Sequence, residues 1–118
     1  MAEPSENEIS VRAAYEFTRN VKTLRKRYPN IRVDIEHTIS SIRQGNFVGN
    51  RITQTGYVVF KARIKNRDIQ KGKSAGYRLI YQIKPQNSVL LLTIYSKSDR
   101  GDISVSAIKK IITETDES

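Results

Sequence analysis

The chain has 118 residues and a net charge of +9, from 21 basic and 12 acidic side chains. A chain of this length usually forms one domain and can bury a core without metal or disulfide crosslinks. The absence of cysteine excludes disulfides and thiolate metal sites, and the single histidine leaves little for a histidine-based metal site. No apolar run approaches the ~20 residues that span a bilayer, and the N-terminus is acidic, so we expect a cytoplasmic protein.

The charge is distributed unevenly along the chain. Residues 1–8 and residues 114–118 each contain three acids and no base, so the segment between them has a net charge of +15. We therefore predict a flexible acidic tail over residues 1–9, a single domain over residues 10–113 and an acidic tail over residues 114–118. So basic a domain points to a polyanion, such as nucleic acid, the ribosome, an anionic membrane or an acidic protein. The alternative is a positive surface that only maintains solubility.

The first part of the domain is predicted to be a strand followed by two helices. Apolar and polar residues alternate over residues 10–17, which is typical of a half-buried strand. Residues 19–28 have apolar side chains at helical spacing with bases between them, and Thr18 is placed to cap this helix. Pro29 ends it, and Asn30 can cap a second helix with an isoleucine stripe. The stripe consists of Ile31, Ile35, Ile39 and Ile42.

Three further strands, rich in β-branched and aromatic residues, are predicted after a polar loop. They are residues 57–65, 77–84 and 89–97. Because successive side chains of a strand point to opposite faces, we expect one apolar face, packed by the helical hairpin, and one cationic face. On the last strand this alternation puts Leu90, Leu92 and Ile94 together. The cationic face collects Lys61, Arg63, Lys65, Arg78, Tyr95 and Lys97.

A long loop and a third helix complete the predicted domain. Residues 66–76 are long for a hairpin loop, which often indicates function, and they carry Arg67, Lys71 and Lys73. Ser104 is placed to cap a short C-terminal helix. We therefore predict an α+β fold with a twisted, mostly antiparallel sheet, packed by an N-terminal helical hairpin and followed by a short C-terminal helix.

Several kinds of catalytic motif are missing from the sequence. It has no glycine-rich phosphate loop, no paired carboxylates in a cleft pattern and no serine with a histidine partner. His37 lies off the isoleucine stripe, so we interpret it as a surface or boundary histidine. Asp99 and Asp102 are interpreted as hydrogen-bonding residues of a loop. We expect no metal and no cofactor.

The cationic face is the strongest functional candidate. Arginine binds phosphate in bidentate fashion and lysine binds it as a point charge. Tyr57 or Tyr95 can offer a ring on which a base stacks, whereas Tyr81 is expected in the core. The alternative is a solvated sheet face whose lysines guard against aggregation. We favour a groove that binds phosphate.

Two segments carry a more specific pattern, GKSAGYRLIY at residues 72–81 and LTIYSKSD at residues 92–99. Weaker matches lie elsewhere in residues 13–112, namely YEFT at 15–18, LRKRY at 24–28, DIE at 34–36 and DIS at 102–104. Together they resemble the RelE/ParE superfamily of bacterial toxins, in particular its RelE and HigB branch. The resemblance implies the toxin of a type II toxin–antitoxin system, an mRNA interferase that cleaves mRNA in the ribosomal A site and inhibits translation.

The resemblance also implies roles for individual residues. In this family a ribose 2′-OH attacks the adjacent phosphate, which gives a 2′,3′-cyclic phosphate and needs a base, an acid and charge stabilisation. Arg78 matches the family's strand arginine that holds the phosphate, and Lys97 matches a basic residue at the end of the last strand. Ser104 stands where the family has a tyrosine, and Tyr95 is the nearest replacement. The candidate catalytic residues are therefore Arg78, Lys97, Lys71, Lys73 and Tyr95.

The remaining cations are assigned to RNA binding, and Lys61 is also a candidate for the base. The RNA-binding candidates are Lys61, Arg63, Lys65, Arg67 and Arg100. The expected partners are a cognate antitoxin protein, the ribosome and mRNA, without a membrane. Two alternatives stay open: a non-enzymatic gyrase inhibitor like ParE, and a catalytically weak relative that only binds RNA or the ribosome.

Overall fold

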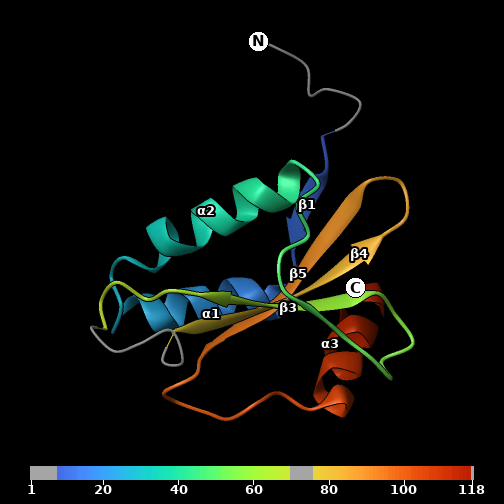
Figure 1. The fold of residues 1–118 in the computed structure, drawn as a ribbon. Coiled ribbons are helices and arrows are strands. Elements are labelled where there is room, and N and C mark those ends of the chain that lie inside the picture. The colour runs from blue at the N-terminus through green and yellow to red at the C-terminus, as the bar shows by residue number, and fades with distance from the viewer. Residues whose placement is uncertain (1–7, 70–75, 118) are drawn as a thin grey trace.

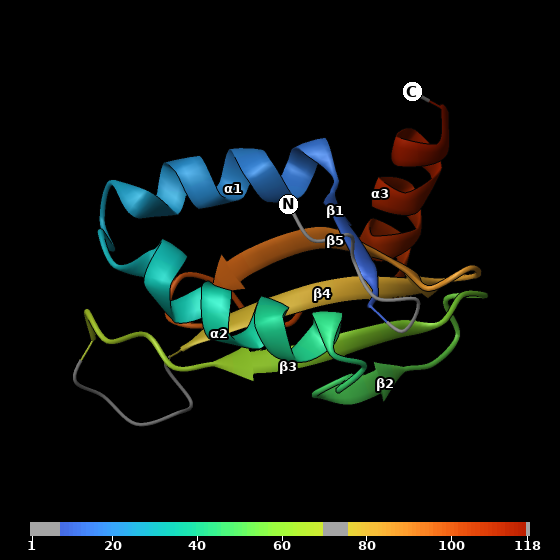
Figure 2. The same ribbon diagram turned by 90° about the horizontal axis from the view of Figure 1, so that it is seen from above.

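The computed structural model of the chain describes residues 8–69 and 76–117. Its elements are β1 (Ser10–Ala13), α1 (Tyr15–Arg25), α2 (Ile31–Arg43), β2 (Asn50–Ile52), β3 (Val59–Ile64), β4 (Tyr77–Lys84), β5 (Ser88–Ser96) and α3 (Val105–Glu117). The strands form one sheet in the order β1-β5-β4-β3-β2, in which β1 and β5 are parallel and the other neighbours are antiparallel. Figure 1 shows α2 and α3 on opposite sides of this sheet, and Figure 2 shows the strands side by side. The predicted α+β architecture is confirmed.

The helical hairpin packs on one face of the sheet as predicted. All four isoleucines of the α2 stripe are buried, and they join the side chains that β3, β4 and β5 present on this face. The hairpin begins earlier than expected, because β1 ends at Ala13 and α1 starts at Tyr15. Phe17 and Val21 are already spaced as a buried helical face, while Tyr15 is 81% exposed. The predicted strand over residues 10–17 and the cap at Thr18 are therefore wrong at this boundary.

The opposite face of the sheet carries a second apolar core. Here α3 packs Ile108, Ile111 and Ile112 against the sheet. The sheet residues of this second core are Val59, Ile80, Leu90, Leu92 and Tyr95. The face that was predicted to be cationic is therefore cationic only in part, because α3 packs its apolar stripe against the remainder.

A β-bulge explains why Leu92 and Ile94 of β5 lie in different cores. Ile80 pairs with Thr93 and Tyr81 pairs with Leu91, so Leu92 is an extra residue on β5. The bulge reverses the alternation, and Ile94 joins the core beneath the hairpin while Leu92 joins the core beneath α3. The prediction that Leu90, Leu92 and Ile94 share one face is therefore wrong.

The ends of the domain differ from the predicted tails. Ile9 is 8% exposed and its backbone N–H donates to the carbonyl of Arg43 at 3.1 Å, so it belongs to the folded domain. The helix α3 continues to Glu117, so residues 114–117 are helical rather than a tail. No helix of the described part of the chain is long and apolar enough to cross a bilayer.

The polar loop before β3 contains the short edge strand β2, which sequence patterns did not reveal. It pairs with β3, bringing Asn50 opposite Lys61. Gly49 precedes it with a φ of +104°, and a side chain there would clash with the Lys61 carbonyl. Only glycine suits both this backbone conformation and this close approach.

Two buried phenols are expected to make stability depend on alkaline pH. Burial raises the pKa of Tyr81 to about 12, and burial followed by the charge of Asp34 raises that of Tyr77 further. Unfolded tyrosine ionises near pH 10, so the unfolded chain loses these protons first. Stability is therefore full below about pH 10 and falls as the pH rises toward 12. Urea unfolding of the Tyr81→Phe variant should show a shallower loss over this range, whereas the exposed control Tyr57→Phe should keep the full loss.

Candidate functional site

Basic side chains gather on three neighbouring strands, on the face that α3 partly covers. Arg63 of β3 lies directly opposite Arg78 of β4, and Arg78 lies directly opposite Tyr95 of β5. Directly opposite residues share a face, with Cβ atoms about 4.5–5.5 Å apart. Because Tyr95 packs in the core beneath α3, the row of Arg63, Arg78 and Tyr95 lies on that face. We call Lys61, Arg63, Arg78 and Lys97 the basic cluster.

Arg78 occupies the centre of the basic cluster. Its side chain lies on the middle strand of the sheet, is only 4% exposed, and donates from Nη1 to the Tyr77 carbonyl at 3.2 Å. A guanidinium keeps its charge in proteins, and like charges directly opposite each other destabilise a sheet. Arg63 and Arg78 are such a pair. A bound anion would relieve their repulsion, and phosphate suits the bidentate geometry of arginine.

The two lysines of the basic cluster meet at one carboxylate. Asp102 Oδ1 lies 3.2 Å from Lys97 Nζ and 3.5 Å from Lys61 Nζ. The hydrogen bond from Lys97, followed by the charge of Lys61, lowers the pKa of Asp102 below its ordinary value. Asp102 is well exposed, at 63% of its side chain, and it belongs to the loop between β5 and α3. The Asp102 carboxylate thus holds the two ammonium groups close together, so that a single bound phosphate can contact both.

Tyr95 places a hydroxyl group in the same region. Its oxygen accepts a hydrogen bond from the Ile103 backbone N–H at 3.4 Å, which leaves its own hydrogen available to donate. The guanidinium carbon of Arg100 lies 5.1 Å from the ring centroid, and the residue is 5% exposed. Because Arg100 covers the ring and the residue is buried, a base is not expected to stack on Tyr95, and the hydroxyl is the group that Tyr95 offers.

The loop after β3 is anchored to the start of α2. Arg67 donates from Nε to Asp34 Oδ1 at 2.7 Å and from its backbone N–H to Oδ2 at 3.1 Å. Asn30, which was expected to cap α2, instead donates from its backbone and its side-chain amide to the carboxylate of Asp68. Arg67 is thus bonded to Asp34 of α2, and a contact between Arg67 and RNA stays a prediction.

The other predicted residues have different surroundings. Lys65 is exposed just after β3 and borders a 530 Å³ pocket next to α2, where His37 is exposed as expected. Tyr57 is 41% exposed and precedes β3, at the other end of that strand from Arg63. Lys71 and Lys73 lie outside the described residues.

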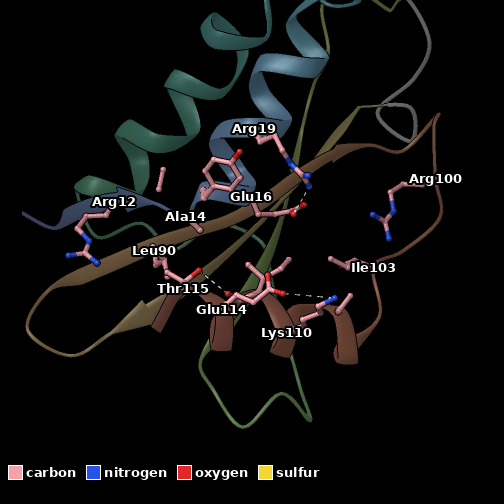
Figure 3. Close-up of a pocket in the computed structure, with 14 residues that line it drawn as sticks. Arg12, Ala14, Glu16, Arg19, Leu90, Arg100, Ile103, Lys110, Glu114 and Thr115 are labelled. Carbon is pink, nitrogen blue, oxygen red and sulfur yellow. Dashed lines mark hydrogen bonds and ion pairs between the residues drawn. The ribbon is translucent and has the colours of Figure 1, made fainter. Parts of the chain in front are cut away.

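A groove of about 880 Å³ lies between the start of α1 and α3 (Figure 3). Its rim contains two ion pairs, Arg19 with Glu16 at 2.9 Å and Lys110 with Glu114 at 3.9 Å. Arg100 lines it as well, so the groove adjoins Tyr95. With both signs of charge on its rim, the groove is less suited to a phosphate than the basic cluster is.

The sequence did not reveal that Asp102 pairs with both Lys61 and Lys97. Asp99 forms a hydrogen bond, as expected, and accepts it from Arg27 Nη1 at 2.8 Å. Asp102 was placed in the same class, but both residues bond to partners outside the loop, since Arg27 is 72 residues from Asp99 and Lys61 is 41 residues from Asp102. No local pattern connects such residues, because only the tertiary structure brings them together.

The residues of 8–69 and 76–117 contain no group of three or more histidines and carboxylates that could hold a metal ion. Comparisons with models of known protein families and with curated proteins find no match for this chain.

Proposed function

We propose that this chain is an endoribonuclease of the RelE type, the toxin of a type II toxin–antitoxin system, which cleaves mRNA in the ribosomal A site. The observation that carries the proposal is the row of Arg63, Arg78 and Tyr95 across three neighbouring strands, with two lysines held beside it. Guanidinium groups suit a phosphate that gains charge, and a phenol suits proton donation. The resemblance of residues 72–81 and 92–99 to RelE-like toxins supports the same function.

The proposed reaction cleaves RNA without water as the nucleophile. The ribose 2′-oxygen bonds to the adjacent phosphorus, the bond from phosphorus to the 5′-oxygen breaks, and the products are a 2′,3′-cyclic phosphate and a 5′-hydroxyl. Arg78 and Arg63 stabilise the charge on the phosphorus-bound oxygens, flanked by the lysines of the basic cluster. Tyr95 gives its proton to the leaving 5′-oxygen. A base takes the proton of the 2′-OH, for which Lys61, Lys71 and Lys73 are the candidates.

The experiment that tests this proposal is primer extension on a reporter mRNA in a reconstituted translation reaction, with and without ribosomes. Cuts at in-frame positions only in the presence of ribosomes are the expected result. Cuts without ribosomes would instead make the chain a free ribonuclease. The absence of cuts, with translation unaffected, would overturn the proposal and direct attention to DNA supercoiling by gyrase.

An acidic antitoxin is the protein partner that fits this proposal. The domain is strongly basic between its acidic ends, and complementary charge favours fast and specific association. We expect the antitoxin to be partly disordered alone and to fold over the basic surface as it binds.

Replacing Asp102 by asparagine is expected to tighten RNA binding. The change leaves Lys61 and Lys97 without the carboxylate that competes with phosphate for their ammonium groups. Exposed ion pairs of this kind are weak, so the gain in affinity should be about two- to fivefold. Fluorescence anisotropy with a 2′-O-methylated RNA, which lacks the attacking hydroxyl, measures binding without cleavage.

The matched control for Asp102 is Glu36→Gln, which removes one exposed carboxylate charge from α2. Its effect on RNA affinity should be smaller than that of Asp102→Asn. If Asp102→Asn weakens binding, Asp102 positions the two lysines for RNA rather than competing with it.

A further inference from the structure

The outward side of α1 carries a second concentration of positive charge. Lys22, Arg25 and Lys26 are exposed, and none of them forms an ion pair with another described residue. They lie within about 6 Å along the helix axis, since each residue adds 1.5 Å. We call these three residues the α1 basic face.

The α1 basic face is connected to the loop that carries part of the proposed site. Arg27, the second residue after α1, pairs with Asp99 at 2.8 Å. Asp99 belongs to the loop after β5, between Lys97 and Arg100. The loop after β5 thus contacts both the basic cluster, through Lys97, and the end of α1, through Asp99.

The composition of this surface favours RNA over an acidic protein. Lysine is depleted in the cores of protein interfaces, which are enriched in aromatic and apolar side chains. The exposed positions between Thr18 and Lys26 of α1 hold only polar and basic residues. The one large exposed apolar side chain of the helix is Tyr15, which is 81% exposed and lies seven residues before Lys22, on the same side. With one aromatic ring among polar and basic side chains, this surface differs from the core of a protein interface.

We propose that the α1 basic face is a second RNA-binding surface, which contacts the phosphate backbone of helical RNA independently of sequence. The inference rests on the proposed function only in taking RNA as the ligand. Contacts from lysine and arginine to phosphates position a protein on a nucleic acid and make its affinity depend strongly on salt. The α1 basic face would thus hold the RNA while the basic cluster acts on it.

The test is a triple variant, Lys22→Gln, Arg25→Gln and Lys26→Gln, in which glutamine preserves helix propensity. Its binding to a labelled RNA duplex is measured by anisotropy over a range of salt concentrations. Each lost phosphate contact should reduce the slope of log affinity against log salt by about 0.9, so we expect a reduction of about 2 to 3. Circular dichroism checks that α1 stays folded.

The matched control is Arg32→Gln, Arg51→Gln and Lys109→Gln, three exposed bases on α2, β2 and α3. It removes the same charge from dispersed positions and should reduce the slope by less than about 1. Equal effects of the two triple variants would overturn the inference, since the positive charge would then act only diffusely. Loss of binding to polyglutamate with RNA binding unchanged would also overturn it in favour of an acidic protein. The readout is binding of an uncut duplex, so it decides the inference whether or not the chain cleaves mRNA.

Discussion

Replacing Arg78 by alanine is expected to lower the rate of RNA cleavage by about 10²–10³, the usual effect of losing a group that stabilises charge in the transition state. Arg78 lies between Arg63 and Tyr95 on the middle strand, so no other guanidinium holds its position. Single-turnover cleavage in a reconstituted translation reaction measures the effect. Because Arg78 is only 4% exposed, thermal unfolding must accompany the assay.

Two further variants serve as controls for Arg78→Ala. Arg78→Lys keeps the charge but loses bidentate geometry, so its rate should fall between those of the unchanged protein and Arg78→Ala. Arg51→Ala removes an exposed arginine from the edge strand β2 and should leave cleavage nearly unchanged. A folded Arg78→Ala protein that still cleaves mRNA and arrests growth would contradict the role assigned to Arg78.

Replacing Ile108 by alanine is expected to lower the free energy of unfolding by about 2–5 kcal/mol. Ile108 is fully buried and belongs to the core in which α3 packs against Ile80 and Leu92. Domains of this size are stable by only about 5–15 kcal/mol, so the loss is a large part of the total. Urea unfolding followed by circular dichroism measures it.

The control for Ile108 is its neighbour Lys109, which is exposed on the same turn of α3. Lys109→Ala should change stability by no more than about 0.5 kcal/mol. A similarly small effect of Ile108→Ala would contradict the packing of α3 in this core.

The helices and the faces of the strands followed from local periodicity. The isoleucine stripe of α2 is buried in full because residues at helical spacing share a side, whatever they pack against. The alternation along β3 and β4 likewise put Arg63 and Arg78 on one face and Ala62 and Leu79 on the other. The boundary between β1 and α1 was missed, because a few alternating residues do not distinguish a strand from the first turn of a helix.

The sequence by itself determined which residues are apolar, which are basic, and which share a side of their own element. Only the tertiary structure decided how those elements meet. Strand register placed Tyr95 opposite Arg78, the bulge at Leu92 put Leu92 and Ile94 into different cores, and α3 covered part of the face expected to be cationic. Asp102 likewise reached Lys61 only through the fold. Register, bulges and helix docking depend on contacts between residues far apart in the chain, and local periodicity carries no information about them.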